Sequence, residues 1–255
     1  MNPTLKLTGL TLRVRDLEAQ RAFYRDLLGL EELGQEENQV QLAPAGRGFT
    51  LSLLHDPAAP LRPQPSLGLY HFALLLPERR ALAAVFRRLL EARYPYLQGA
   101  SDHGVSEALY LADPESNGIE LYRDRPRLEW PWNGDRIEMR SERLDVESLL
   151  AQAAQSAPLD PQTLFGHLHL HVANLDEAER FFTGLGLVVT QRDYPGARFL
   201  AADGYHHHIG INLWARGRTA PPESTGLLGY RLALQGHKPQ TLHDPNATPV
   251  EVWPL

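Results

Sequence analysis

An internal repeat constrains the fold of this chain more than any other feature of its sequence. Residues 10–24 read LTLRVRDLEAQRAFY, and residues 168–182 read LHLHVANLDEAERFF. Each segment has the pattern of an alternating strand, an acidic turn and an amphipathic helix that ends in two aromatic side chains. Each then enters a leucine–glycine stretch, DLLGL at 26–30 and GLGL at 184–187. Because the same order of elements recurs, the chain is predicted to contain copies of one unit.

A second pair of segments marks the remaining units. Residues 69–90, LYHFALLLPERRALAAVFRRLL, are again strand, turn and helix, and this unit closes with DPESNGIELYRD at 113–124. The C-terminal DPNATPVEVWPL at 244–255 has the same layout, with Glu251 placed after its aspartate as Glu120 is placed after Asp113. The stretch from 230 to 244 is too short to hold a full helix, so the last unit is predicted to be truncated.

These repeats predict an α+β fold of four βαβββ units, near 5–56, 67–125, 164–216 and 226–255, the last truncated, that pair into two half-barrel-like domains. We expect a first domain of two units over residues 5–125 and a linker over 126–163. A second domain over 164–255 would then hold one full and one truncated unit. The linker opens with RPRLEWPWNGDR and continues with a predicted helix at LDVESLLAQAA. Alternating strands of this kind are typical of a curved sheet with one face lining a cavity.

Composition narrows the functional classes. The 255 residues are 43% hydrophobic and 22% charged, which is an ordinary globular balance. The net charge is −6 and no basic block stands out, so neither a nucleic-acid partner nor a membrane partner is expected. Cysteine is absent, which excludes disulfides, zinc–thiolate sites, iron–sulfur clusters and thiol nucleophiles. Without a signal-peptide pattern or a run of about 18 apolar residues, a cytoplasmic protein is expected.

Histidines form two clusters. His167, His169 and His171 alternate in GHLHLHVANL, so all three project from one face of a strand, where imidazoles are good metal ligands. The alternative is a polar strand with solvated histidines. In YHHHIGINLW at 205–214, alternation predicts that His208 faces the same side as His206 and that His207 points away.

Other candidates lie in the second unit. His71 opens the apolar strand LYHFALLLP, where it is either a hydrogen-bonded core histidine or a ligand. His103, Tyr110 and Glu120 lie close together in the run from 99 to 124. Glu120 is flanked by Ile119 and Leu121, so its carboxylate faces either solvent or the cavity. The residues alone leave these alternatives open.

Together these segments resemble the vicinal oxygen chelate superfamily of glyoxalases, bleomycin-resistance proteins and extradiol dioxygenases, and within it the two-domain bacterial catechol 2,3-dioxygenases. The resemblance rests on the runs LYHFALLLP, DHGVSEALYLADP, NGIELYRDRP, GHLHLHV and GYHHHIGIN and on the Trp-rich linker. It implies that His71, His167 and Glu120 bind a metal. It also implies that His208 is the catalytic acid–base group and that His103 and Tyr110 hydrogen-bond the substrate.

The order of the units departs from the better-known members of this family, where the last two units hold the metal. Here the matching residues come from units two and three, whereas units one and four open with Gly9 and with Tyr230 and Arg231. We therefore expect units two and three to pair around the working site. Units one and four would pair around an empty one, with Glu251 outside the ligand set.

The resemblance implies a metal-dependent extradiol dioxygenase that cleaves a catechol-type aromatic diol with O₂. Two histidines and one carboxylate suit Fe(II), and Mn(II) is the alternative metal. Because one fold supports many functions, two other classes stay open. These are a glyoxalase-like or fosfomycin-resistance-like metalloenzyme and a metal-free small-molecule-binding resistance protein. The sequence also leaves open the ring substituents of the diol and whether the chain forms a homo-oligomer.

Overall fold

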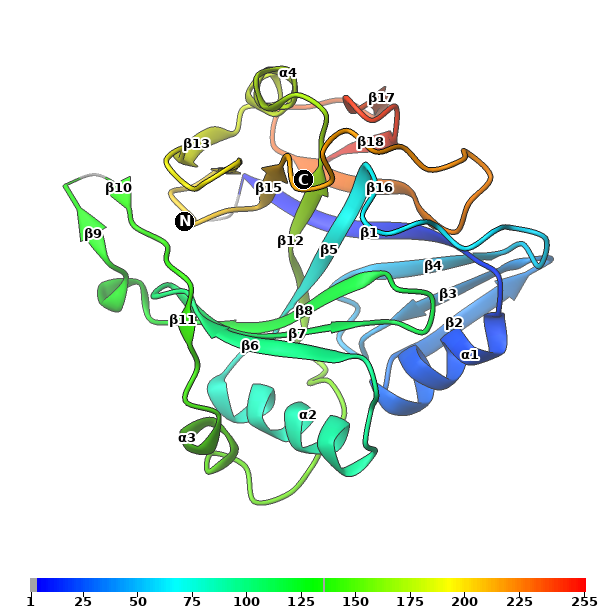
Figure 1. Ribbon diagram of the computed structural model, residues 1–255, viewed down its shortest axis with the longest axis vertical. Helices are drawn as coiled ribbons and strands as arrows, with labels where there is room; N and C mark the ends of the chain where they lie inside the picture. The colour runs from blue at the N-terminus through cyan, green and yellow to red at the C-terminus, as the bar shows by residue number, and fades with distance from the viewer. Residues whose placement is uncertain (1–3, 135) are drawn as a thin grey trace.

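Two antiparallel strands, β5 (Gly68–Leu75) and β12 (Leu164–His171), run side by side through the centre of the molecule (Figure 1). The computed structural model describes residues 4–134 and 136–255. Each central strand has a parallel partner, β8 (Gly118–Asp124) beside β5 and β15 (Ile209–Asn212) beside β12. The antiparallel strands β6 (Leu97–Asp102), β7 (Ser106–Ala112), β13 (Val188–Gln191) and β14 (Ala197–Ala201) extend the two sides. This pairing joins the second unit to the third.

The first and last units pair in the same way. β1 (Leu5–Val14) lies antiparallel to β16 (Gly226–Leu234), with β4 (Thr50–His55) parallel to β1 and β18 (Pro249–Pro254) parallel to β16. β2 (Glu31–Glu36), β3 (Gln39–Ala43) and β17 (Gln240–His243) complete these units. Units two and three therefore pair as predicted. Strand pairing also joins unit one to unit four, so it does not group the units into the expected domains 5–125 and 164–255, because each pair takes one unit from either side of the linker. The α+β class is confirmed, and strands outnumber helices.

Helices cover the outer faces of the sheet. α2 (Arg79–Glu91) buries Leu82, Val85 and Leu89, which share one helix face because they are three, four or seven positions apart. α4 (Leu175–Gly184) is capped by Asn174, whose side chain accepts hydrogen bonds from two backbone N–H groups. In the first unit, α1 (Leu17–Arg21) continues as the π-helix η1 (Ala22–Leu27). α2 and α4 lie at opposite ends of the molecule in Figure 1, with the central strands between them.

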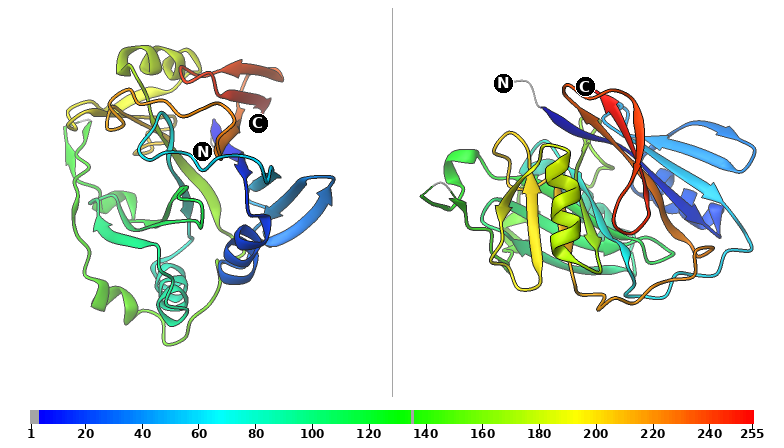
Figure 2. Two further views of the ribbon diagram at one scale, coloured as in Figure 1. Left: turned by 45° about the vertical axis from the view of Figure 1, so that its right-hand side comes forward. Right: turned by 90° about the horizontal axis from the view of Figure 1, so that it is seen from above.

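The linker takes part in the architecture. It contains the 3₁₀ turn η2 (Arg127–Glu129), the short strands β9 (Trp132–Asn133) and β10 (Arg136–Ile137), and the helix α3 (Val146–Leu150). Its strand β11 (Glu142–Arg143) pairs with β6 and so extends the sheet of the second unit. Figure 2 shows the linker running along one side of the molecule. The linker therefore borders the half-barrel formed by units two and three.

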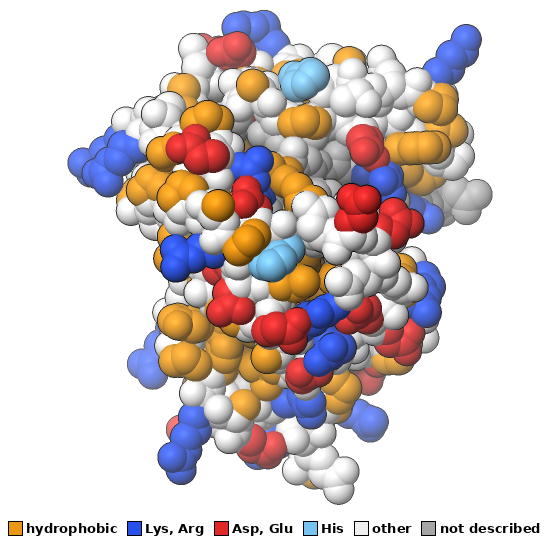
Figure 3. All heavy atoms as spheres, turned by 90° about the vertical axis from the view of Figure 1, so that its right-hand side faces the viewer, with side chains coloured by type: hydrophobic (Ala, Val, Ile, Leu, Met, Phe, Trp, Pro, Cys, Tyr) orange, Lys and Arg blue, Asp and Glu red, His pale blue; other side chains and the backbone are white. Residues whose placement is uncertain are grey.

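The surface carries both signs of charge. On the face drawn in Figure 3, acidic and basic side chains are interspersed between small hydrophobic groups. Across the described part of the chain, no helix has the length and apolar character needed to cross a membrane.

Candidate metal centre and its pocket

Strand register brings His71, Glu120 and His167 to one point. Ala73 on β5 is the register partner of both Glu120 on β8 and His167 on β12. The carboxylate and the imidazole therefore lie on either side of a small methyl group, which leaves room between them. His71 is two positions before Ala73, so its side chain projects from the same face of β5.

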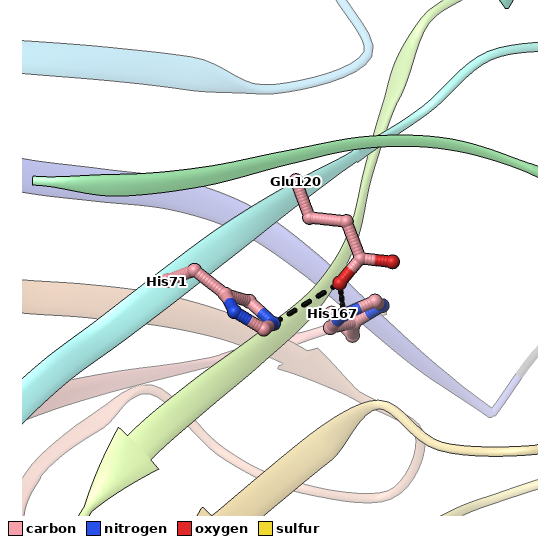
Figure 4. A group of neighbouring side chains, drawn as sticks. All are labelled: His71, Glu120 and His167. Atoms are coloured by element: carbon pink, nitrogen blue, oxygen red, sulfur yellow. Dashed lines mark hydrogen bonds and ion pairs between the residues drawn. The ribbon is translucent and has the colours of Figure 1, made fainter. Parts of the chain in front are cut away.

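The three side chains converge closely (Figure 4). His71 Nε2 and His167 Nε2 each lie 3.1 Å from Glu120 Oε2. One ligand atom from each residue lies within 4.8 Å of the other two, and all three residues are buried. Elsewhere among residues 4–134 and 136–255, no other set of three His, Asp or Glu side chains comes as close together. The residues that the resemblance marked as ligands are thus brought together.

The chemistry of this group fits a divalent metal. Burial by itself would raise the pKa of Glu120, but the two imidazoles lower it well below its usual range. Burial lowers the pKa of His71, which favours a neutral ring with a free lone pair. His71 Nε2 forms no hydrogen bond among the described residues, although it faces a carboxylate oxygen. Two imidazole nitrogens and one carboxylate oxygen directed at one point are the donor set of a two-histidine, one-carboxylate metal site.

A glycine shapes the space behind the centre. Gly166 directly precedes His167, and a Cβ atom at this position would lie 1.9 Å from the hydroxyl oxygen of Tyr122. Tyr122 is fully buried and its ring centroid is 4.9 Å from that of His167. Only glycine lets this ring pass so close to the backbone, and the ring then packs against the imidazole.

A cavity of about 300 Å³ opens beside the centre. His71 and Glu120 line it together with aromatic, histidine and linker side chains, namely Tyr70, Ser101, His103, Tyr110, Met139, Arg140, Ser141, His169, Tyr194, Phe199, His207 and Trp214. Three of these, Met139, Arg140 and Ser141, belong to the linker. The linker was not among the predicted site residues, because nothing in its composition predicted that β11 would pair with β6.

His103 and Tyr110 form a pair on the cavity wall. His103 Nε2 lies 2.7 Å from the Tyr110 hydroxyl, and His103 Nδ1 lies 2.7 Å from the backbone oxygen of Arg140. A carbonyl oxygen only accepts, so Nδ1 donates, and the His103 tautomer with this proton accepts the Tyr110 proton at Nε2. Burial, with the nearby Glu120 carboxylate, raises the pKa of Tyr110 well above its usual range, so the phenol stays protonated.

The expected orientation of the second histidine cluster is wrong. His207 lines the cavity, with its ring centroid 4.1 Å from that of His167. His208 instead lines a different hollow beside Tyr205, and its Nδ1 accepts a hydrogen bond from the backbone N–H of Ala202. Alternation failed because β15 begins only at Ile209, so residues 205–208 are not a strand. The Asp-Gly pair at 203–204, which has positive φ at both residues, was the available turn signal.

A hydrogen-bond chain orients His207. The Asp124 carboxylate accepts a hydrogen bond from His206 Nε2 at 2.9 Å, and His206 Nδ1 lies 2.8 Å from His207 Nδ1. The His206 tautomer with its proton on Nε2 accepts at Nδ1, so His207 donates from Nδ1. Burial and the neighbouring imidazoles lower the pKa of His207 well below its usual range, which keeps the ring neutral. The remaining nitrogen of His207, Nε2, therefore holds a lone pair.

The corresponding position between units one and four differs. Glu251 accepts a hydrogen bond from Arg231 Nε at 2.8 Å, and both side chains are more than two-fifths exposed. Gly9, Tyr230 and Arg231 line the hollow at this place. Arg231 is the register partner of Glu251, as Ala73 is of Glu120, so a guanidinium lies where the other half has a small methyl group. This carboxylate therefore has a guanidinium as its partner in place of two imidazoles.

Comparison of sequences gives two relatives. The profile of the Glyoxalase/Bleomycin resistance protein/Dioxygenase superfamily matches residues 6–121. The chain is 43% identical over 225 residues to catechol-2,3-dioxygenase of Bacillus subtilis (strain 168), a match that spans 86% of this chain and 78% of the relative. It is 28% identical over 130 residues to biphenyl-2,3-diol 1,2-dioxygenase 3 of Rhodococcus globerulus, spanning 49% of this chain and 66% of the relative.

Comparison of structures supports the same fold. A crystal structure from Bacillus subtilis superimposes with a TM-score of 0.67 at 14% identity, covering 99% of this chain and 86% of that one. Glyoxalase I of Zea mays superimposes with a TM-score of 0.58 at 12% identity, covering 98% of this chain and 92% of that one. At these identities the likeness concerns the fold alone.

Proposed function

Because the chain belongs to the Glyoxalase/Bleomycin resistance protein/Dioxygenase superfamily, we propose that it is a metal-dependent extradiol dioxygenase that cleaves a catechol-type aromatic diol with O₂. One observation supports this most strongly. Two members of the ligand group, His71 and Glu120, line the same cavity as Tyr110 and His207, which can exchange hydrogen bonds and protons with a bound diol. The 43% identity to a catechol-2,3-dioxygenase favours the same reaction class.

His71, Glu120 and His167 would hold the metal. Fe(II) is the metal we propose, and Mn(II) is the alternative, because both accept this donor set. When bound, such a metal supplies the electron-transfer chemistry by which O₂ and a diol react. The contribution of the chain is to place the diol, to keep water away and to move protons.

His207 is the acid–base group of this proposal, in place of His208. Its Nε2 lone pair is left free by the contact of Nδ1 with His206, and the residue lines the cavity. A neutral imidazole in this position can take a proton from a diol hydroxyl and return it to the opened product. A positioned proton-transfer group of this kind contributes about 10²–10⁴-fold to the rate.

Tyr110 and His103 orient the substrate oxygens. The phenol of Tyr110 donates to His103, so its oxygen can accept a hydrogen bond from a diol hydroxyl. His103 in turn is held by the carbonyl of Arg140 in the linker. This anchoring fixes the direction of the phenol and so the position of the diol relative to the metal ligands.

The remaining wall suits a single aromatic ring. Tyr70, Phe199 and Trp214 line the cavity and offer apolar or aromatic faces against which a flat ring can pack. A volume of about 300 Å³ is at the lower end of the range of roughly 300–1,000 Å³ for small-molecule sites. The cavity therefore favours a one-ring diol over a fused or multi-ring one.

Metal analysis followed by an oxygen assay tests the proposal. Protein purified without O₂ is expected to contain close to one divalent metal per chain. With catechol it should consume one O₂ per diol, and ¹⁸O₂ should place both labelled atoms in the ring-opened acid. Metal-containing protein without diol-dependent O₂ uptake would contradict the dioxygenase assignment, and turnover of a thiol adduct would favour the glyoxalase-like alternative. Protein that binds no metal would contradict the proposed function and favour the alternative of a metal-free small-molecule-binding protein.

A further inference from the structure

A buried amide beside the metal centre has an orientation that the backbone determines. Asn212 ends β15 and is fully buried. Its Oδ1 atom lies 2.9 Å from the backbone nitrogen of Trp214 and 2.6 Å from His171 Nδ1. A backbone N–H can only donate, so the atom facing it must be the amide oxygen, and the two ends of this side chain are distinguished.

The amide nitrogen then determines which nitrogen of His169 holds the proton. Asn212 Nδ2 lies 3.0 Å from His169 Nε2. An amide NH₂ has no acceptor, so His169 Nε2 must accept this hydrogen bond. The proton of the imidazole is therefore on Nδ1. The amide excludes the opposite tautomer, because two N–H groups would then face each other.

His169 Nδ1 is open to the cavity that His169 lines, because it has no hydrogen-bond partner among the described residues and is not among the fully buried unpaired atoms. The ring lies flat over Gly210, where a Cβ atom would come within 2.8 Å of His169 Cγ and Cδ2. His169 lines the same cavity as His71 and Glu120. Its ring centroid is 5.0 Å from that of His71. An N–H donor without a protein partner is thus presented next to the diol site.

We propose that His169 is a specificity-determining residue, which donates its Nδ1–H to a hydrogen-bond acceptor on a ring substituent close to the diol, and that Asn212 is its positioning residue. The inference rests on the proposed function and narrows it to diols that have such an acceptor. Three aromatic side chains, Tyr70, Phe199 and Trp214, pack around the His169 ring. An apolar substituent would fit there but would leave the donor without a partner. We expect an acceptor to be preferred over a shape-matched apolar group by about 3- to 10-fold.

A matched pair of substrates measures this preference. 3-Methoxycatechol and 3-ethylcatechol have substituents of equal length, and only the methoxy group accepts a hydrogen bond. Wild-type protein should favour the methoxy compound by about 3- to 10-fold in kcat/KM and in the dissociation constant measured without O₂. His169→Phe keeps an aromatic ring but removes the donor, so both ratios should fall to about 1.

Asn212→Asp tests the positioning role. A carboxylate of the same shape only accepts, so His169 would turn its proton to Nε2 and present a lone pair to the cavity. The preference for methoxy should then fall to 1 or below. In ¹⁵N-histidine-labelled protein loaded with diamagnetic Zn²⁺, the nitrogen shifts of His169 should change from the Nδ1–H to the Nε2–H pattern. Asn38→Asp is the control, because it adds the same charge in an exposed turn outside the cavity. It should leave the methoxy-to-ethyl ratio and the His169 tautomer unchanged.

The outcomes separate the inference from the proposed function. A wild-type ratio near 1, an Nε2–H tautomer in wild-type protein, or an unchanged ratio in His169→Phe would overturn the inference even if both diols are cleaved. Absence of diol cleavage by wild-type protein would overturn the proposed function, while the binding ratio and the tautomer would still test His169. If Asn212→Asp does not fold, the His169→Phe ratio and the wild-type tautomer decide the matter.

Discussion

Replacing Glu120 by glutamine tests the metal centre against a control that the chain itself provides. Glu120 and Glu251 occupy corresponding positions in the second and fourth units, and each lies on the last strand of its unit. Glu120 is buried between two imidazoles, whereas Glu251 is about half exposed and pairs with Arg231. Glu120→Gln and Glu251→Gln therefore remove the same charge from the same place in the repeat, and only the first removes an expected ligand.

Coulomb's law gives the size of the expected effect. At an effective dielectric constant of about 20, a dication and a carboxylate about 4 Å apart attract each other by about 8 kcal/mol. The cost of removing a carboxylate from water offsets several kcal/mol of this attraction. If about 3 kcal/mol remains, Glu120→Gln weakens metal binding by about 100-fold. An exposed ion pair such as Glu251 with Arg231 contributes about 0–1 kcal/mol to stability, so Glu251→Gln should leave metal affinity unchanged.

Competition against a metal-binding dye gives the dissociation constant of each protein for Fe(II), measured under nitrogen, and for Mn(II), measured in air. Circular dichroism of the metal-free variants checks that each still folds. Equal affinity in wild type and Glu120→Gln would refute the assignment of the carboxylate as a ligand. An equal loss in both variants would show that net charge, and not coordination, sets the affinity.

Three further predictions concern the surrounding residues. His207→Gln should lower catechol-dependent O₂ uptake by about 10²–10⁴-fold with the metal retained. His208→Gln should change this uptake by less than about threefold. The reverse result would restore His208 as the acid–base group. Burial lowers the pKa of His208 to about 4, so between about pH 6.5 and 4 the unfolded chain binds more protons and stability falls as the pH falls. Between pH 7 and pH 5, the free energy of unfolding of metal-free His208→Gln should therefore fall by about 2 kcal/mol less than that of metal-free wild type, as measured by urea titration. An equal fall in both proteins would contradict this. Gly166→Ala places a methyl group against the buried Tyr122 ring and should lower Tm by about 2–12 °C. Gly34→Ala is the control, because its added methyl group meets no atom within 4 Å, and it should not lower Tm in this way. Equal Tm values for the two variants would show that the Tyr122 ring can move aside.

Much of the fold was predictable because the repeated units are recognised from patterns among residues close together in sequence. Alternation in β5 and β12, the polar cap at Asn174 and the helical periodicity of α2 are each set by neighbouring residues. The resemblance then pointed to the three residues that converge at the metal centre. It also indicated that units two and three pair, since the ligand positions of units one and four hold other residues.

The orientation of the histidine cluster at 206–208 was decided by tertiary structure. Alternation applies only where the chain is extended and paired, and the turn at 203–204 delays the start of β15 until Ile209. Contacts with the distant Asp124 then hold His206, and His206 in turn orients His207 toward the cavity. No pattern within the cluster encodes a partner more than 80 residues away.

The sequence by itself determined which residue types could bind a metal and on which strands they lie, because strand periodicity is a local property. Only the tertiary structure decided that the linker closes the cavity, through the pairing of β11 with β6. It alone also decided that Asn212 directs the proton of His169. The physical reason is that a hydrogen bond between elements depends on atoms within about 3 Å, and such distances arise only when segments far apart in sequence pack together.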